Sequence, residues 1–417
     1  MIKLISFIKV RRNFIGYLLL RILNMALGFI TNVFIIRQLS VNDYGVFSIA
    51  LMLIGLFTTF GFSWSSSSIL YFGSREKAKT GNLNKTFWSR NIIIAISLLI
   101  MTILFGLFRN QINNYIGLEV ALLVLIWLYI SVAEDYLVQY FLAVKKQLLS
   151  SLLSFTAKSI YLTMIIIFSF DVKTLILINI ISHATVLLYI IKINKSDIGK
   201  FEFDKSWFKK IFNFSIWQLF GFSGLYLINF GDTFVINHFM TTEDVGIYNA
   251  AYKLFDPIGN FSFVISSYYA SSITQNFINK SSGKIRQFFY KERFLILLLS
   301  TLGHIVVMAL ARPLIVTFFG VEYTDSVVIF QILMVGSIFK YASVFYMLYF
   351  NANGKHRLQQ FINIFRAIFN VVLNVILIKQ FGLIGVAVGT TLSIIVTLLI
   401  SAIYSEKKVL ELSKETP

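Results

Sequence analysis

Residues 361–404 read FINIFRAIFNVVLNVILIKQFGLIGVAVGTTLSIIVTLLISAIY, and this stretch decides the fold class. It is apolar almost throughout and long enough to cross about 30 Å of hydrocarbon twice, since one helical crossing takes about 20 residues. Its apolar residues run continuously and do not alternate with polar ones, as they would in the strands of a membrane barrel. The stretch therefore predicts two transmembrane helices, at 359–379 and 382–404.

The whole chain has the composition of an integral membrane protein. Of its 417 residues, 57% are hydrophobic and only 13% are charged, and the mean hydropathy is +0.77. A soluble domain would carry about 25% charged residues. Ten more apolar runs bring the predicted spans to twelve, the others lying at residues 14–36, 45–68, 91–108, 116–142, 148–168, 172–192, 211–237, 246–273, 294–318 and 326–349. The sequence predicts an all-α integral membrane protein.

The positive charge is distributed unevenly along the chain. A net charge of +18 would suggest nucleic acid binding in a soluble protein, but here its position matters more than its total. With the N-terminus inside, the inner segments hold twenty-seven Lys and Arg residues, whereas the outer loops hold only Arg37, Arg109, Lys173 and Lys379. The positive-inside rule then predicts that both termini are cytoplasmic, and we expect no nucleic acid partner.

The most polar internal stretch divides the spans six and six. We predict an N-terminal six-helix bundle at residues 1–193, a cytoplasmic linker at 194–210 and a C-terminal six-helix bundle at 211–417. A weak repeat at an offset of 201 supports this division, with Asp43, Gly45, Phe47 and Ala50 matching Asp244, Gly246, Tyr248 and Ala251. Repeats of the same orientation imply two bundles that handle a cargo between them, and chance similarity of apolar segments is the alternative.

Five cations lie deep inside predicted spans, where each costs about 2.5 to 3.5 kcal/mol unless it faces a bundle interior or a wet cavity. Two of them, Arg21 and Arg366, are accompanied by amides on the same helix faces. We predict that these side chains line a cavity and bind an anionic cargo, because guanidinium groups donate paired hydrogen bonds to phosphate. The predicted cavity residues are Arg21, Asn24, Lys158, Lys253, Lys340, Arg366 and Asn370. The alternative is that they only hold helices together.

Four carboxylates also lie within the spans: Glu134, Asp135, Asp232 and Asp256. Ionisable groups at such depth mark proton relays or ion pairs, so we predict that these four couple transport to an ion or neutralise cations. Asp256 follows Lys253 by three residues on one helix face, and a salt bridge between them is an equal expectation. For Glu134 and Asp135, an ion pair with a neighbouring Arg or Lys is the competing interpretation.

The sequence contains few of the motifs that are typical of an enzyme. No Walker, GxSxG or zinc motif occurs, so we expect no catalytic residue, no metal and no cofactor. A membrane polysaccharide polymerase would be expected to carry a large outer loop, and the predicted outer loops are short. A membrane acyltransferase would need a buried catalytic His, yet His183 and His304 have no acid nearby in sequence. These two enzyme classes remain as remote alternatives.

Several motifs in this order and spacing resemble those of Wzx-type polysaccharide repeat-unit flippases. They are residues 37–48, 231–233, 245–254, 319–323 and 353–355, followed by Asn370, Asn374 and 381–385. The resemblance covers nearly the whole chain. It implies the fold of the multidrug/oligosaccharidyl-lipid/polysaccharide exporter superfamily, in which two six-helix bundles form a V around a central cavity.

The same resemblance implies a function. It predicts a flippase that moves undecaprenyl-pyrophosphate-linked oligosaccharide units from the inner to the outer leaflet of the bacterial cytoplasmic (inner) membrane by alternating access. The units would serve O-antigen (lipopolysaccharide) or capsule assembly, with polysaccharide polymerase machinery as a further partner. A cation-coupled drug or small-molecule antiporter of the same fold is the alternative, and its cavity would be acidic instead of basic.

Overall fold

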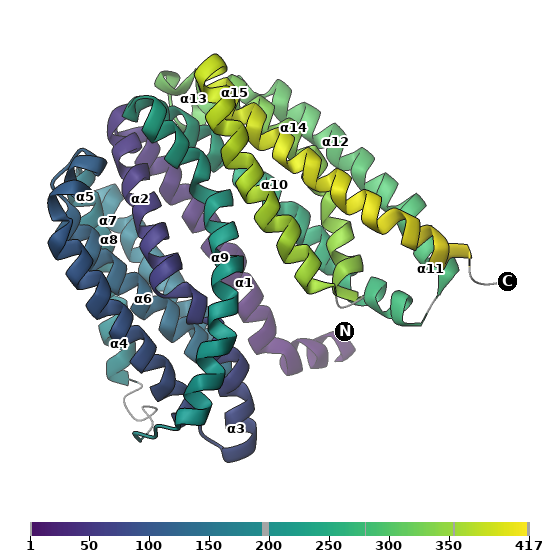
Figure 1. Ribbon diagram of the computed structural model, residues 1–417, viewed down its shortest axis with the longest axis horizontal. Helices are drawn as coiled ribbons and strands as arrows, with labels where there is room; N and C mark the ends of the chain where they lie inside the picture. The colour runs from purple at the N-terminus through teal and green to yellow at the C-terminus, as the bar shows by residue number, and fades with distance from the viewer. Residues whose placement is uncertain (1, 194–199, 280, 353–354, 415–417) are drawn as a thin grey trace. The chain divides into compact units, whose positions relative to one another are not determined.

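The computed structural model describes residues 2–193, 200–279, 281–352 and 355–414, which are mainly helical and contain no strand (Figure 1). Ten helices in these ranges are long and apolar enough to cross a membrane. The bent helix α15 (His356–Lys414) is counted once among these ten and contains two of the predicted spans, whereas the 37-residue helix α10 (Thr242–Ile278) is not among them. The predicted all-α membrane fold is thus confirmed. Residues 194–199 of the predicted linker, and Asn353 and Gly354, lie outside the described residues.

The chain divides into two compact units, residues 1–223 and 224–417. The first unit contains α1 (Ile2–Gln38), α2 (Val41–Gly61), α3 (Ser74–Thr80), α4 (Asn84–Leu107), α5 (Arg109–Ile116), α6 (Ala121–Ala143), α7 (Gln147–Ile167) and α8 (Val172–Ile193). Helix α9 (Lys205–Phe239) begins in this unit and ends in the next. The bundle boundaries predicted from the sequence stay predictions.

The second unit contains α10, α11 (Ser282–Gln287), α12 (Arg293–Ala309), α13 (Ala311–Phe318), α14 (Ser326–Ala352) and α15. Helix α14 packs along both α10 and α15, and these three helices, with α9, carry the polar side chains described below. Buried aromatic residues pack near the C-terminal end of α10, among them Phe288, Phe345 and Tyr349. These rigid apolar contacts fix the helix faces on which the polar groups stand.

The second part of the predicted linker packs against the start of α4. The indole Nε1 of Trp88 donates to the carbonyl oxygen of Lys200 at 3.0 Å, and that of Trp207 donates to Thr86 Oγ1 at 2.9 Å. Asp204 caps α9, since its carboxylate accepts from the backbone N–H of Trp207 at 3.1 Å. This hydrogen bond, together with those donated by the Ser206 hydroxyl and by Lys85 Nζ, lowers the pKa of Asp204 to about 2. The linker is therefore anchored where α9 begins.

The predicted span at 294–318 is not one helix, which corrects the sequence-based prediction. The chain forms α12 up to Ala309 and restarts as α13 at Ala311. Pro313 explains the break, because it has no N–H to donate to the carbonyl of Ala309, as an uninterrupted helix would require. In the first turn of α13 the missing N–H costs nothing, since N–H groups there have no partner within the helix.

The two predicted spans at the end of the chain meet at a single residue. Helix α15 bends at Gly382, whose backbone has φ 55° and ψ −138°. Only glycine adopts this conformation without a steric clash between Cβ and the backbone. Gly382 therefore joins the two halves of α15 with almost no connecting loop.

The Gly382 conformation gives a stability prediction. Replacing Gly382 with Ala should lower the free energy of unfolding by about 1 to 3 kcal/mol, because a Cβ strains this backbone. The melting temperature of the purified protein in detergent would report the change. Gly303→Ala is the matched control, since Gly303 lies in α12 and a Cβ there meets no atom within 4 Å. Equal melting temperatures for the two variants would contradict the assigned bend.

Candidate functional site

A polar cavity of about 490 Å³ lies among the helices of the second unit. It contains four of the residues predicted from the sequence: Lys253, Asp256, Lys340 and Arg366. The amides and hydroxyls that line it beside them are Asn229, Asn249, Asn260, Asn363, Gln359, Tyr252, Ser343, Thr390, Thr397 and Ser401. Three cations and one carboxylate thus share a cavity whose other polar groups are neutral. Such a lining attracts an anion that also carries hydroxyl groups.

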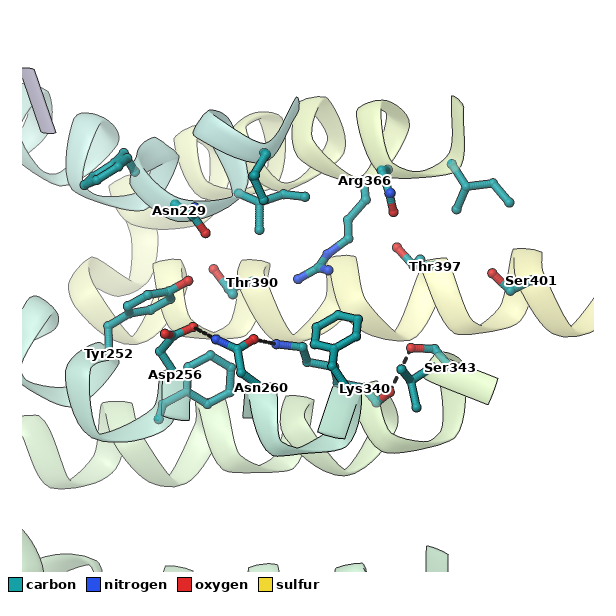
Figure 2. A pocket seen from close by; sticks show the side chains of 18 of the residues that line it. Asn229, Tyr252, Asp256, Asn260, Lys340, Ser343, Arg366, Thr390, Thr397 and Ser401 are labelled. Atoms are coloured by element: carbon teal, nitrogen blue, oxygen red, sulfur yellow. Dashed lines mark hydrogen bonds between the residues drawn. The ribbon is translucent and has the colours of Figure 1, made fainter. Parts of the chain in front are cut away.

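Figure 2 shows how the charged groups of the cavity are connected. Asn260 Nδ2 donates to Asp256 Oδ1 at 2.7 Å, and Lys340 Nζ donates to Asn260 Oδ1, also at 2.7 Å. Lys340 Nζ also lies 5.2 Å from the centre of the Phe263 ring. Lys340 is therefore held by an amide and a ring, and Asn260 separates it from the carboxylate. In the described residues no ion pair joins Asp256 to Lys253, so the salt bridge that their spacing allowed is not formed.

Arg366 extends from the first half of α15 into this cavity (Figure 2). Its Nε is buried and has no hydrogen-bond partner among the described residues. A buried guanidinium nitrogen without an acceptor is costly, because nearly all buried polar groups in proteins are hydrogen bonded. Arg366 therefore has an unused donor inside a cavity that holds two more cations. An anionic group bound there would supply the missing acceptor.

Asp232 lies next to the cavity at the centre of a buried hydrogen-bond network. Its carboxylate accepts from Tyr248 at 2.5 Å, from Thr390 at 2.8 Å and from Asn374 at 2.7 Å. Asn370 Nδ2 in turn donates to Thr390 Oγ1 at 2.9 Å. Because Thr390 also lines the cavity, the network reaches the cavity wall. Asp232 and Asn370 were both candidate site residues in the sequence. The structure places them in one cluster of side chains from α9, α10 and α15.

The predicted carboxylates of the first unit lie in a different pocket, of about 330 Å³. Both Glu134 and Asp135 line it. Glu134 is 2.5 Å from Nδ1 of His183 and accepts from Ser154 Oγ at 2.8 Å. Its partner is therefore a histidine and not the Arg or Lys anticipated from the sequence. His183 stands 49 residues away on α8, so the absence of a nearby acid in sequence did not exclude this pair.

The remaining predicted cavity residues also belong to the first unit. The Nε of Arg21 donates to the hydroxyl of Tyr17 at 3.1 Å, and the Arg21 side chain is exposed. Asn24 Nδ2 donates to the carbonyl of Ser151 at 3.2 Å and so ties α1 to α7. Lys158 is half-buried and points toward α1. The roles of these three residues in cargo binding stay predictions.

Arg90 is a buried cation that sequence reasoning missed. Its side chain is 1% exposed and lies 5.8 Å from the centre of the Tyr136 ring. Its Nε and Nη1 have no hydrogen-bond partner among the described residues. In the sequence Arg90 ends a basic segment before an apolar run, which is the usual position of a cation that sets topology. The burial of Arg90 follows from the start of α4 at Asn84, about two turns earlier, and only the structure gives that start.

Comparisons with known proteins agree with one another. The family described as "Polysaccharide biosynthesis protein" matches residues 10–268 of the chain. The chain is also 24% identical over 196 residues to the "Probable low-salt glycan biosynthesis flippase Agl15" of Haloferax volcanii. That similarity spans 47% of this chain and 42% of the Haloferax protein, so it covers less than half of either.

Solved structures share the fold over nearly the full length. The lipid II flippase MurJ in an inward closed conformation has a TM-score of 0.76 at 16% identity, covering 96% of this chain and 90% of MurJ. An inward-facing multidrug resistance MATE family transporter of the MOP superfamily has a TM-score of 0.70 at 15% identity, covering 94% of this chain and 96% of the transporter. At these identities the likeness concerns the fold alone.

The Asp232 network can be tested by removing its acceptor. Asp232→Ala should lower the free energy of unfolding by more than about 3 kcal/mol, because three buried donors lose a partner at about 1 to 3 kcal/mol each. Asp232→Asn should cost less, since one carbonyl oxygen remains. Melting of the purified variants in detergent would measure both, with Glu322→Ala as an exposed control. A melting temperature of Asp232→Ala close to that of the control would show that the network does not stabilise the fold.

Proposed function

Because the chain belongs to the polysaccharide biosynthesis protein family, we propose that it is a flippase for a lipid-linked oligosaccharide. The lipid tail of such a molecule belongs in hydrocarbon, whereas its phosphate and sugars need shelter during the crossing. A membrane protein with a polar cavity among its helices can provide that shelter. The family, the named Haloferax flippase and the solved transporters of this fold all support a transporter over an enzyme.

The cargo is an oligosaccharide unit on undecaprenyl pyrophosphate, moved from the inner to the outer leaflet of the bacterial inner membrane. Movement follows alternating access between two six-helix bundles, with both termini in the cytoplasm. The unit serves O-antigen or capsule assembly and is passed to polysaccharide polymerase machinery. The support is the basic cavity, the uneven distribution of Lys and Arg, and the resemblance of the motifs.

The unpaired Nε of Arg366 is the observation that carries this proposal. A pyrophosphate offers several charged acceptor oxygens, and guanidinium and ammonium groups are its usual protein partners. Lys253 and Lys340 line the same cavity as Arg366. The amides around them would suit the hydroxyl groups of sugars.

The rival function is cation-coupled export of drugs or other small molecules by the same fold. A cavity for organic cations would need an excess of carboxylates. Among the described residues, this cavity has Asp256 as its only carboxylate, against three cations. Its charge therefore favours an anionic cargo, although the fold itself is shared with a MATE transporter.

The membrane potential can drive the proposed export. With the inside negative, moving two negative charges outward gains roughly 4 to 5 kcal/mol per 100 mV. Ion coupling would use the intramembrane carboxylates, of which Asp232 and Glu134 are the best placed because each has hydrogen-bond donors from neighbouring helices. We propose these two as the coupling residues if a counter-ion takes part.

Removing the Arg366 guanidinium tests the proposed function. Arg366→Ala should weaken binding of polyprenyl pyrophosphate by roughly 10- to 150-fold, since a hydrogen bond to a charged group is worth about 1.5 to 3 kcal/mol. Arg366→Lys keeps the charge and should lose less. Binding to the purified protein and transport in proteoliposomes would both be measured.

Arg312→Ala is the matched control, because Arg312 is exposed in α13 and does not line the cavity. All variants should be checked for an unchanged melting profile, which separates loss of cargo binding from loss of fold. Wild-type binding and transport in Arg366→Ala would refute the proposed role of the cavity.

A further inference from the structure

A second polar pocket lies at the far end of α10, where that helix meets α11. Its volume is about 620 Å³, within the range of small-molecule sites. Its walls combine aromatic rings with neutral polar side chains, namely Tyr268, Tyr269, Ser272, Gln275, Asn276 and Gln287. None of these residues belongs to the cation-lined cavity, so the two pockets are separate features of the second unit.

The length of α10 indicates that this pocket lies near the membrane surface in the proposed topology. The helix begins at Thr242, and at about 1.5 Å per residue Tyr268 stands roughly 39 Å along it. A helix needs about 20 residues to cross about 30 Å of hydrocarbon, so a crossing by α10 would put Tyr268 near an interfacial layer and Asn276 farther out. Five Lys and Arg residues follow between positions 276 and 293. In the proposed topology this is the cytoplasmic surface.

The aromatic part of the pocket offers an open ring that contacts a neighbouring ring on one side. Tyr268 is 82% exposed and makes an edge-to-face contact with Tyr269, with 5.1 Å between the ring centres. Tyr269 is held in turn by Phe288, at 5.2 Å. A ring that is supported on one side and open on the other can stack on the apolar face of a sugar. The amides of Gln275 and Asn276 supply donors and acceptors for its hydroxyl groups.

The charge of this pocket is balanced, unlike that of the cavity. It contains one cation, Lys284, and one carboxylate, Glu292. Gln287 Nε2 donates to Glu292 Oε1 at 3.0 Å, which orients both side chains at the pocket wall. A phosphate gains little here, because the single cation is offset by the carboxylate. The lining instead suits an uncharged ligand rich in hydroxyl groups.

We infer that this pocket binds the uncharged sugar part of the cargo at the cytoplasmic surface, before the pyrophosphate enters the cation-lined cavity. The assignment of the ligand to the cargo rests on the proposed function. Carbohydrate binding at Tyr268 does not depend on that function. The two pockets thereby divide recognition, with sugar selected at the surface and phosphate held within the membrane.

Soluble probes test this inference on the purified full-length protein. Saturation-transfer NMR would measure binding of free maltose, chitobiose and fucose, and of inorganic pyrophosphate in a separate titration. At least one sugar should bind, and Tyr268→Ala should weaken it about tenfold through loss of the stacking ring. Gln275→Ala should also weaken it. Tyr268→Phe keeps the ring and should bind as the wild type does.

The outcomes separate the two proposals. Sugar binding should be unchanged in Arg366→Ala, whereas pyrophosphate binding should be weakened in Arg366→Ala and unchanged in Tyr268→Ala. If none of the sugars binds the wild type, or if Tyr268→Ala and Gln275→Ala bind as it does, the sugar pocket is refuted while the cavity is unaffected. If sugar binding depends on Tyr268 but pyrophosphate binding is unchanged in Arg366→Ala, the sugar pocket is supported and the proposed function of the cavity is refuted.

Discussion

The free energy of holding charge inside a hydrocarbon layer constrains everything else in this protein. Lys253, Lys340 and Arg366 cannot face lipid, so their helices must turn these faces toward one another and toward a shared cavity. The apolar residues on the other faces, such as Phe361 and Ile368 of α15, are exposed and free to meet acyl chains. The same constraint that fixes helix rotation therefore also creates the polar cavity. The fold and the proposed function thus depend on one physical constraint.

The spans were predictable because hydrophobic length is a strong signal, and the break near Gly382 was visible in the polar Lys379 and Gln380. The division of α12 from α13 was missed because the run stays largely apolar up to Phe318, although Arg312 and Pro313 interrupt it. Hydropathy measures burial in lipid and does not register a missing N–H. Pro313 was the sequence signal for the break, and the structure shows that it lies in the first turn of a new helix.

Single residues of the site were easier to predict than their partners. The charged side chains stood out because they are rare in apolar runs, and four of them line one cavity. Their hydrogen bonds could not be predicted, since Glu134 and His183, or Asp232 and Thr390, meet only through packing of distant helices. Asn260 was overlooked because an uncharged amide in a span is common, yet it connects Asp256 to Lys340.

The bend at Gly382 has a consequence for how the chain enters the membrane during synthesis. A helical pair with a long polar connection must carry that connection through the translocon, with the cost of dehydrating it. The two halves of α15 are joined at one glycine, and Lys379 is the nearest charged residue. Little polar backbone has to be transferred, so both halves can insert together as one compact hairpin. Insertion of this helical pair then costs little beyond moving the ammonium group of Lys379.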